Sequence, residues 1–242
     1  MDINTLYLTD PLEALQKLER RSIDLVIADP SALLPVQSAL PRPANRRRGR
    51  RSASAQRPRF NPAPLLEETR RVLKVYNAFF FTTKALLPAY IAFAQQHGYA
   101  WDLIIWEHGA PVNELQPTCD FIITIWERGA YFNPDLKQSF FQKVKYHTVG
   151  KLRASPELPS EKPRKLVREF ILQRSRPGDL VLDPFAGAGS VAVAARESGR
   201  NFIAFEGNPK WYAVAKQNLE RSYQRLPGNN DTNNGQLRIN YG

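Results

Sequence analysis

The sequence predicts an α/β fold with a doubly wound, mostly parallel β-sheet. Short apolar runs alternate with amphipathic helical segments along the 242 residues, and this alternation is typical of a parallel sheet covered by helices on both faces. A glycine-rich turn, PFAGAGS, joins a strand to a helix, as in doubly wound sheets. Two similar segments, IIWEHGA from Ile104 and TIWERGA from Thr124, indicate neighbouring strands that we expect to form an antiparallel hairpin at one edge.

The first part of the chain supplies three helices and two strands. Asp10, Pro11 and Glu13 form a helix start with a capping residue, and apolar residues recur at helical spacing behind them. Another helix begins at Asn61 and Pro62. A third helix covers 85–97 and ends at Gly98, a residue that commonly ends helices. The two predicted strands are Ile23–Ala28 and Val75–Thr82.

The second part of the chain repeats the alternation of helix and strand. Residues 131–161 lack a clear period and predict a connecting loop. Lys162–Ser175 reads as a helix with an apolar face. The stretch from Pro177 to Leu219 then predicts a turn, a strand ending at Asp183, the glycine loop, a helix, a strand ending at Glu206 and a last helix.

The length and the 43% hydrophobic content favour one domain, which we place at residues 1–226. Residues 41–60 predict a mobile basic loop within it, because their Pro, Arg, Ser and Ala content has no apolar periodicity. The polar, glycine-rich segment 227–242 predicts a disordered tail.

Composition excludes several classes of protein. A single cysteine, Cys119, rules out a disulfide framework, and three scattered histidines give no zinc pattern, so we expect no metal site. The sequence has no apolar run of membrane-spanning length and does not begin with a signal peptide. We therefore expect a soluble protein, in the cytoplasm or with the nucleoid.

The positive charge is concentrated in one segment. The chain carries a net charge of +11, and residues 41–60 hold eight arginines and no acid, so the rest carries 11 − 8 = +3. Contact with phosphates is favoured because it releases counterions, although a solvated loop without a partner remains an alternative. The candidate DNA-binding residues are Arg46, Arg47, Arg48, Arg50 and Arg51.

The glycine loop predicts a site for a cofactor that contains a nucleoside. Gly187 and Gly189 allow the backbone to approach a ligand closely, and the following helix start offers free N–H groups. Glu206 ends the next strand, 23 residues after Asp183, where an acid can bind both hydroxyls of a ribose. A dinucleotide enzyme is the alternative, but it would need further strands after Glu206, where only one helix and a tail follow. An acid that merely starts a helix is the other interpretation of Glu206.

The segment DPFAGAGSVAVAARESGRNFIAFEGNPKWYAVAKQNL resembles the S-adenosylmethionine motif of DNA amino-methyltransferases of the restriction-modification type. The upstream stretch EKPRKLVREFILQRSRPGDLVLDPF and the N-terminal stretch YLTDPLEALQKLERRSIDLVIADP resemble the same family, over about residues 5–37 and 60–222. The catalytic motif precedes the cofactor motif, which is the permuted order of the beta class. The resemblance implies a Rossmann-like methyltransferase fold.

The resemblance also implies which residues bind S-adenosylmethionine. Asp183, Phe185, Gly187 and Gly189 would surround the methionine part of the cofactor, and Glu206 would bind the ribose. Lys162 and Pro163 correspond to the lysine-proline pair of the family, whereas Glu161 replaces its usual small or neutral residue.

The strand Ile23–Ala28 ends in Asp29 and Pro30, which correspond to the first two residues of the family's four-residue catalytic motif. An acid there would accept a hydrogen bond from the exocyclic amine of a flipped-out base, and a backbone carbonyl would accept the other. Ser31 and Ala32 replace the second proline and the stacking aromatic residue. Phe60 or Tyr131 would then cover the base.

The resemblance implies methyl transfer to a DNA base, with adenine slightly favoured over cytosine because position 29 is an acid. Asp29 could otherwise only end a strand and cap a turn. The alternative function is a catalytically silent relative that binds cofactor or DNA, or supports a partner methyltransferase subunit. DNA is the expected partner, and a homodimer or a partner subunit stays open.

Overall fold

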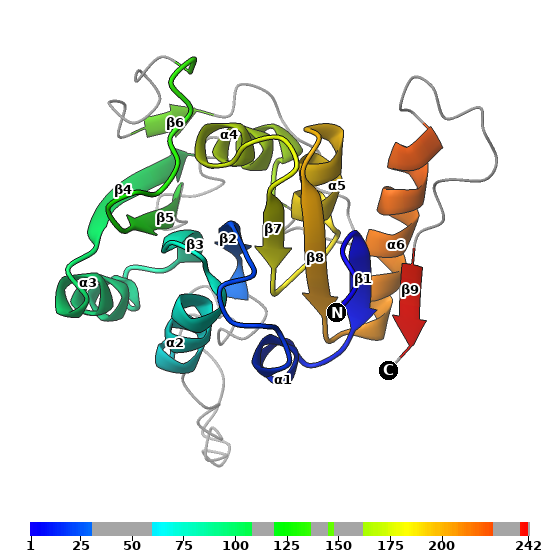
Figure 1. Cartoon of the computed structure of the whole chain (residues 1–242), viewed down its shortest axis with the longest axis horizontal. Helices are drawn as coiled ribbons and strands as arrows, with labels where there is room; N and C mark the ends of the chain where they lie inside the picture. The colour runs from blue at the N-terminus through cyan, green and yellow to red at the C-terminus, as the bar shows by residue number, and fades with distance from the viewer. Residues whose placement is uncertain (31–59, 108–118, 137–144, 148–161, 225–237, 242) are drawn as a thin grey trace, which may run out of the picture.

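The computed structural model describes residues 1–30, 60–107, 119–136, 145–147, 162–224 and 238–241. The described strands form one nine-stranded sheet in the order β6-β4-β5-β3-β2-β7-β8-β1-β9 (Figure 1). The strands are β1 (Thr5–Leu8), β2 (Leu25–Ala28), β3 (Asn77–Thr82), β4 (Ala100–Glu107), β5 (Cys119–Trp126), β6 (Lys145–His147), β7 (Leu180–Asp183), β8 (Asn201–Glu206) and β9 (Arg238–Tyr241). The helices are α1 (Pro11–Gln16), α2 (Ala63–Val72), α3 (Leu87–Gln96), α4 (Arg164–Arg174), α5 (Ser190–Glu197) and α6 (Pro209–Gln224).

The predicted mostly parallel sheet is confirmed. β5 pairs antiparallel with β3 and β4, and the other strand pairs of the described sheet are parallel. The predicted antiparallel hairpin of β4 and β5 is also confirmed. Its two similar segments do not lie opposite each other, because Trp106 pairs with Asp120 and Trp126 pairs with Ala100. The two tryptophans therefore lie at opposite ends of the paired strands.

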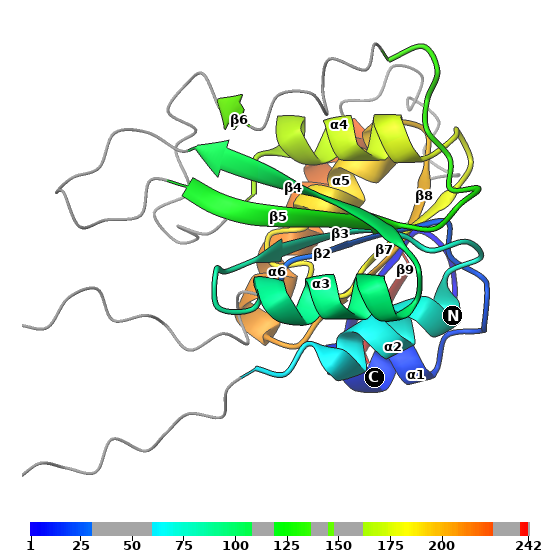
Figure 2. The same cartoon turned by 90° about the vertical axis from the view of Figure 1, so that its left-hand side faces the viewer.

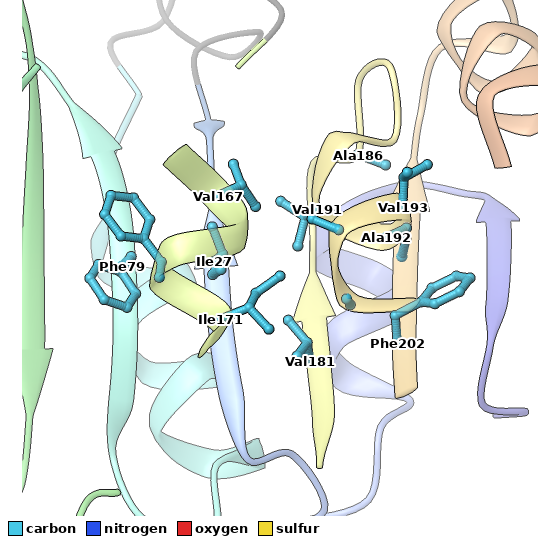
Figure 3. Close-up of a cluster of buried hydrophobic side chains, with 14 of the residues drawn as sticks. Ile27, Phe79, Val167, Ile171, Val181, Ala186, Val191, Ala192, Val193 and Phe202 are labelled. Atoms are coloured by element: carbon cyan, nitrogen blue, oxygen red, sulfur yellow. The ribbon is translucent and has the colours of Figure 1, made fainter. Parts of the chain in front are cut away.

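The sheet separates two layers of helices, with α4 and α5 on one face and α1, α2 and α3 on the other (Figure 2). Alternation along β2 serves both layers: Leu25 and Ile27 belong to the cluster under α4, α5 and α6, whereas Val26 and Ala28 belong to the opposite cluster. Figure 3 shows the first cluster, where Ile27, Phe79 and Val181 of the sheet meet Val167 and Ile171 of α4. Both faces are buried, as expected of a parallel sheet.

The structure contains three strands that we did not predict. We did not predict β1, we expected a loop over residues that include β6, and we expected disorder at Arg238–Tyr241, where β9 pairs with β1. Each is three or four residues long, and each depends on the free backbone groups of a strand already in the sheet. Such pairing leaves little trace in the sequence, although RINY of β9 does alternate polar and apolar residues.

The other predicted elements are present with shifted ends. Asp10 caps α1 as expected, because its carboxylate accepts hydrogen bonds from the backbone N–H groups of Leu12 (2.9 Å) and Glu13 (3.0 Å). The predicted strand at Ile23 begins instead at Leu25, and Ile23 makes an isolated bridge with Leu73. In the described part of the chain, the helices are too short or too polar to cross a membrane.

Helix α4 is fixed on the sheet mainly by Phe170. Its side chain is fully buried, and its ring stacks on Phe79 of β3 with a centroid distance of 4.4 Å. One turn later the guanidinium of Arg174 lies 3.7 Å from the Phe132 ring centroid and donates to Thr124 Oγ1 at 3.0 Å. Burial lowers the pKa of Arg174 to about 9. The helix therefore has a defined register on the sheet, and this sets the position of the residues before it.

We predict that Phe170→Ala lowers the free energy of unfolding by about 3–5 kcal/mol, because it removes a fully buried ring and leaves a cavity between α4 and β3. Phe170→Leu keeps most of the volume and should cost less than about 1.5 kcal/mol. Urea unfolding followed by circular dichroism measures both values. Equal costs for the two variants would contradict the packing role of the ring.

Candidate active site

The carboxyl ends of three neighbouring parallel strands bring Asp29, Asp183 and Glu206 to one edge of the sheet. Asp183 and Glu206 are the last residues of β7 and β8, and Asp29 directly follows β2. β7 lies between β2 and β8 in the sheet. The charges of Asp29 and Glu206 both raise the pKa of Asp183, so the three carboxylates are close enough to interact. The sequence prediction that these residues share one site is consistent with this arrangement.

The glycine loop between β7 and α5 is a tight turn whose backbone only glycine adopts without strain at two positions. Gly187 and Gly189 have φ angles of 52° and 81°. Gly189 N donates to Ala186 O at 2.7 Å, and Ala186 N donates to Phe205 O of β8 at 2.8 Å. A side chain at Gly189 would begin 3.1 Å from Ala215 Cβ of α6. The loop is thus tied to β8 and closely covered by α6.

Glu206 connects this loop with the start of α6. Its Oε2 accepts a hydrogen bond from Gly187 N and its Oε1 accepts one from Asn208 N, both at 2.8 Å. Each carboxylate oxygen has a second lone pair, so Glu206 can still accept hydrogen bonds from two hydroxyls. The helix-start interpretation of Glu206 and its ribose-binding interpretation are therefore compatible.

Asp183 is buried deep in the edge, with 2% of its surface exposed. Its Oδ1 accepts a hydrogen bond from Phe185 N at 3.1 Å, as the turn after β7 requires. Burial raises the pKa of Asp183 well above its usual range, and the nearby carboxylates of Asp29 and Glu206 raise it further. Burial also raises the pKa of Glu206. A cation bound beside these groups would stabilise their charged forms.

Lys162 brings a positive charge to the same edge. Its Nζ lies 2.7 Å from Asp29 Oδ2 and 5.1 Å from the centroid of the Phe81 ring. The two charged side chains are 12% and 18% exposed, so solvent screens them only partly. From the sequence we predicted Lys162 among the cofactor residues and Asp29 among the catalytic ones. Their ion pair could not be predicted, because the two residues are 162 − 29 = 133 positions apart in the sequence.

The two rings proposed to cover a base lie at different edges. Phe60 comes just before α2. The first turn of α2 lies at the carboxyl edge of the strands, because the helix leads back to the start of β3. The Phe60 ring packs on the core under α2. Tyr131 was wrong as a candidate. Its ring stacks on Arg176 at 4.2 Å, beyond the end of α4, at the opposite edge of the sheet. No pattern in the residues around Tyr131 indicates that it lies at the other edge from Asp29.

A further aromatic residue lies near the carboxyl edge. Phe121 pairs with Thr82 at the end of β3, and Lys84 Nζ lies 5.6 Å from the centroid of its ring. The ring is only partly buried. An aromatic face beside a cation is a common combination in sites that bind single bases. Phe121 could not be predicted from the sequence, because only the pairing of β5 with β3 brings it to this edge.

Several predicted residues lie outside the described part of the chain, namely Ser31, Ala32, Glu161, His108 and the arginines of the loop 41–60, including Arg46, Arg47, Arg48, Arg50 and Arg51. Trp106 is buried in the core, and His97 stacks on Tyr99 within an aromatic cluster. Among the residues that the structure describes, no group of three or more His, Cys, Asp or Glu side chains could hold a metal ion.

The residues at the carboxyl edge fit S-adenosylmethionine. The glycine loop leaves open space at Gly187, and the first turn of α5 offers backbone N–H groups to a carboxylate. Glu206 has acceptor capacity for ribose hydroxyls. The buried Asp183, with its raised pKa, favours a nearby cation such as a sulfonium. The carboxylate, the ribose and the sulfonium of the cofactor therefore each have a matching group at this edge.

Comparison with known proteins agrees with this geometry. The chain is 27% identical to the type II methyltransferase M.HinfI of Haemophilus influenzae over 90% of this chain and 68% of that protein. It is 42% identical to the DNA adenine methyltransferase YhdJ of Escherichia coli K12, over 26% of this chain and 21% of that protein. The fold is similar to that of M1.HpyAVI, solved as a complex with S-adenosylmethionine, with a TM-score of 0.65, 19% identity, and coverage of 89% of this chain and 99% of that one.

A family model described as DNA methylase, for the N6 and N4 methyltransferases, matches residues 61–217, more than half of the chain. The match includes the glycine loop, Asp183, Glu206 and Lys162. The permuted order, with Asp29 before the cofactor motif, agrees with the sheet order in which β2 adjoins β7. The chain therefore belongs to the N6/N4 DNA methylase family, whose members are S-adenosylmethionine-dependent enzymes that methylate exocyclic amino groups of DNA bases.

Proposed function

We propose that this protein transfers a methyl group from S-adenosylmethionine to the exocyclic amine of a DNA base, with Asp29 and Pro30 as the catalytic residues. The observation that carries the proposal is the position of Asp29. It lies at the end of β2, next to the β7 edge that leads into the glycine loop. A base whose amine reached Asp29 would meet a cofactor bound at that loop.

The chemistry is a direct displacement, for which the cofactor supplies an electrophilic methyl carbon on a positively charged sulfur. The lone pair of the amine forms the new C–N bond, the S–CH₃ bond breaks, and its electrons remain on sulfur. Asp29 accepts a hydrogen bond from the amine, and the backbone carbonyl at Pro30 accepts the second. These contacts draw the amine lone pair out of the ring and leave the released proton near a carboxylate.

Phe60 and Phe121 are the two rings that we propose for base stacking. Both lie near the carboxyl edge, and the motif itself carries Ala32 where the family has an aromatic residue. Stacking on an aromatic side chain stabilises a flipped base by about 1–3 kcal/mol, so a ring from another element can replace the missing one.

Adenine is the favoured base because position 29 is an acid and because the similar protein YhdJ is named an adenine methyltransferase.

The second candidate function is that of a catalytically silent relative, which Ser31 and Ala32 in the motif favour. The proposed assembly, a homodimer or a complex with a partner subunit, rests on the sequence resemblance. Sedimentation of the purified protein, alone and with DNA, tests it.

We predict that Asp29→Ala lowers the rate of methyl transfer by about 10²-fold or more, since it removes the acceptor of the amine. The rate is measured with labelled S-adenosylmethionine on double-stranded DNA, single-stranded DNA and RNA. Asp135→Ala, which changes an exposed acid, serves as the control and should keep the wild-type rate. Cofactor binding without any transfer by the wild type would favour the silent relative, and an active Asp29→Ala enzyme would exclude the proposed role.

We predict that Asp183→Asn stabilises the cofactor-free protein at alkaline pH and weakens cofactor binding by about tenfold or more. Because the fold raises the pKa of Asp183, its protonated form contributes to stability. This contribution is complete below the usual aspartate pKa of roughly 3.9, and it is lost as the pH rises through the raised pKa. Asparagine keeps the acceptor for Phe185 N and never ionises, so its advantage should reach about 1–3 kcal/mol near pH 8. Urea unfolding near pH 5 and pH 8 measures this, and a loss of stability at the higher pH would contradict it.

We predict that replacing Arg46, Arg47, Arg48, Arg50 and Arg51 by glutamine weakens DNA binding and makes it less sensitive to salt. If each arginine neutralises one phosphate, the slope of log affinity against log salt concentration should fall by about 4 to 5. Fluorescence anisotropy over a salt series measures the slope. Cofactor affinity should stay unchanged, and an unaltered slope would show that the basic loop does not contact DNA.

A further inference from the structure

Lys162 is held at the catalytic edge by two contacts. Its Nζ forms an ion pair with Asp29 Oδ2 at 2.7 Å and lies over the Phe81 ring at 5.1 Å. At 12% exposure, the lysine side chain is mostly withdrawn from water. Burying an ammonium group is costly unless a partner compensates for the lost hydration, and Asp29 is such a partner.

Lys162 brings a positive charge to an edge that is rich in acids. Asp183 faces Asp29 from β7, with Glu206 next in β8, and the charges of Asp29 and Glu206 both act on Asp183. From the other face of the sheet, Tyr90 of α3 lies close enough to interact with Asp29. Lys162, just before α4, attracts the Asp29 carboxylate and so favours one direction for it.

The backbone around Lys162 fixes where its charge lies. Pro163, which is buried, occupies the cap position of α4, so the lysine stands directly before the helix. The helix is anchored by Phe170 on Phe79. The same face of β3 contributes Phe81, on which the ammonium group rests. Lys162 therefore approaches Asp29 from a rigid element, which is what positioning of a carboxylate requires.

We propose that Lys162 is a positioning residue for Asp29: its ammonium group holds Oδ2 of the carboxylate, so that the carboxylate is oriented to accept a hydrogen bond from the target amine. A carboxylate without this contact would turn about its side-chain bonds and would hold the productive orientation for less of the time. This inference rests on the proposed function, in which Asp29 is the acceptor. It assigns Lys162 to the catalytic step, in addition to any contact with the cofactor.

The role is more important here because the motif has one proline instead of two. Pro30 restricts Asp29 to extended backbone conformations, but Ser31 does not restrict Pro30 in the way that a second proline would. An ion pair with Lys162, from the segment before α4, adds a constraint on the carboxylate that the motif does not itself supply.

The test compares Lys162→Met and Lys162→Arg with Lys165→Met, which removes the same charge from an exposed position in the first turn of α4. Lys162→Met should lower kcat by about tenfold or more while KM for DNA changes little, because the orientation of Asp29 is lost and the binding of DNA is not. Lys162→Arg keeps the positive charge and should restore most of kcat. Lys165→Met should match the wild type in both kcat and KM.

Two outcomes in an active enzyme would overturn the proposal. One is a Lys162→Met enzyme with the kcat and KM of Lys165→Met. The other is a loss confined to S-adenosylmethionine affinity in equilibrium dialysis, with kcat unchanged at saturating cofactor, which would make Lys162 a cofactor ligand only.

If the wild type transfers no methyl group, the proposed function itself fails, and thermal unfolding of Asp29→Asn, Lys162→Met and the double variant tests the ion pair alone. Additive shifts in Tm would show that the two residues are not coupled and would overturn the proposal as well.

Discussion

The pairing of β2 with β7 is the constraint on which the rest of the structure depends. It joins residues 25–28 to residues 180–183, with Leu25 opposite Val181 and Val26 opposite Leu182. Asp24 fixes the start of this pair: its carboxylate accepts a hydrogen bond from Leu180 N at 2.9 Å and forms an ion pair with Lys74 at 2.9 Å. Because both strands are parallel and in register, Asp29 and Asp183 must reach the same edge. A slip by one residue would turn Asp183 toward the opposite helical layer.

The central features of this arrangement could be predicted from the sequence, whereas those that depend on tertiary contacts could not. The glycine loop, the strands ending at Asp183 and Glu206, and the β4–β5 hairpin have local signatures, since turn residues and apolar runs act within a few positions. β1 and β9 have no such signature, because they exist by pairing with a neighbour. Tyr131 and Phe121 show the same limit for the site: only the antiparallel direction of β5 decides which ring faces which edge. The ion pair of Lys162 with Asp29 likewise follows from the β2–β7 pairing.

The residues around Asp29 can compensate for the two altered positions of the catalytic motif. Loss of the motif aromatic and of the second proline removes one stacking partner and one backbone restraint, and neither loss touches the acid itself. The neighbourhood of Asp29 retains a strand end, the cation of Lys162 just before α4, and two candidate rings near the edge. Functions that the family concentrates in four consecutive residues can thus be distributed over separate elements of the same sheet edge.

The charges at this edge also link cofactor binding to stability. The raised pKa of Asp183 shows that the cofactor-free fold disfavours its ionised form, and the neighbouring carboxylates of Asp29 and Glu206 add to this effect. Lys162 offsets part of the repulsion through Asp29, whereas Asp183 has no lysine contact of that kind among the ion pairs of the described residues. A sulfonium bound beside the glycine loop would supply a second positive charge near Asp183. Binding then stabilises the fold by mass action and also by relieving an unfavourable charge arrangement, so a cofactor with a neutral sulfur, as in the demethylated product, should bind with less stabilisation than the substrate.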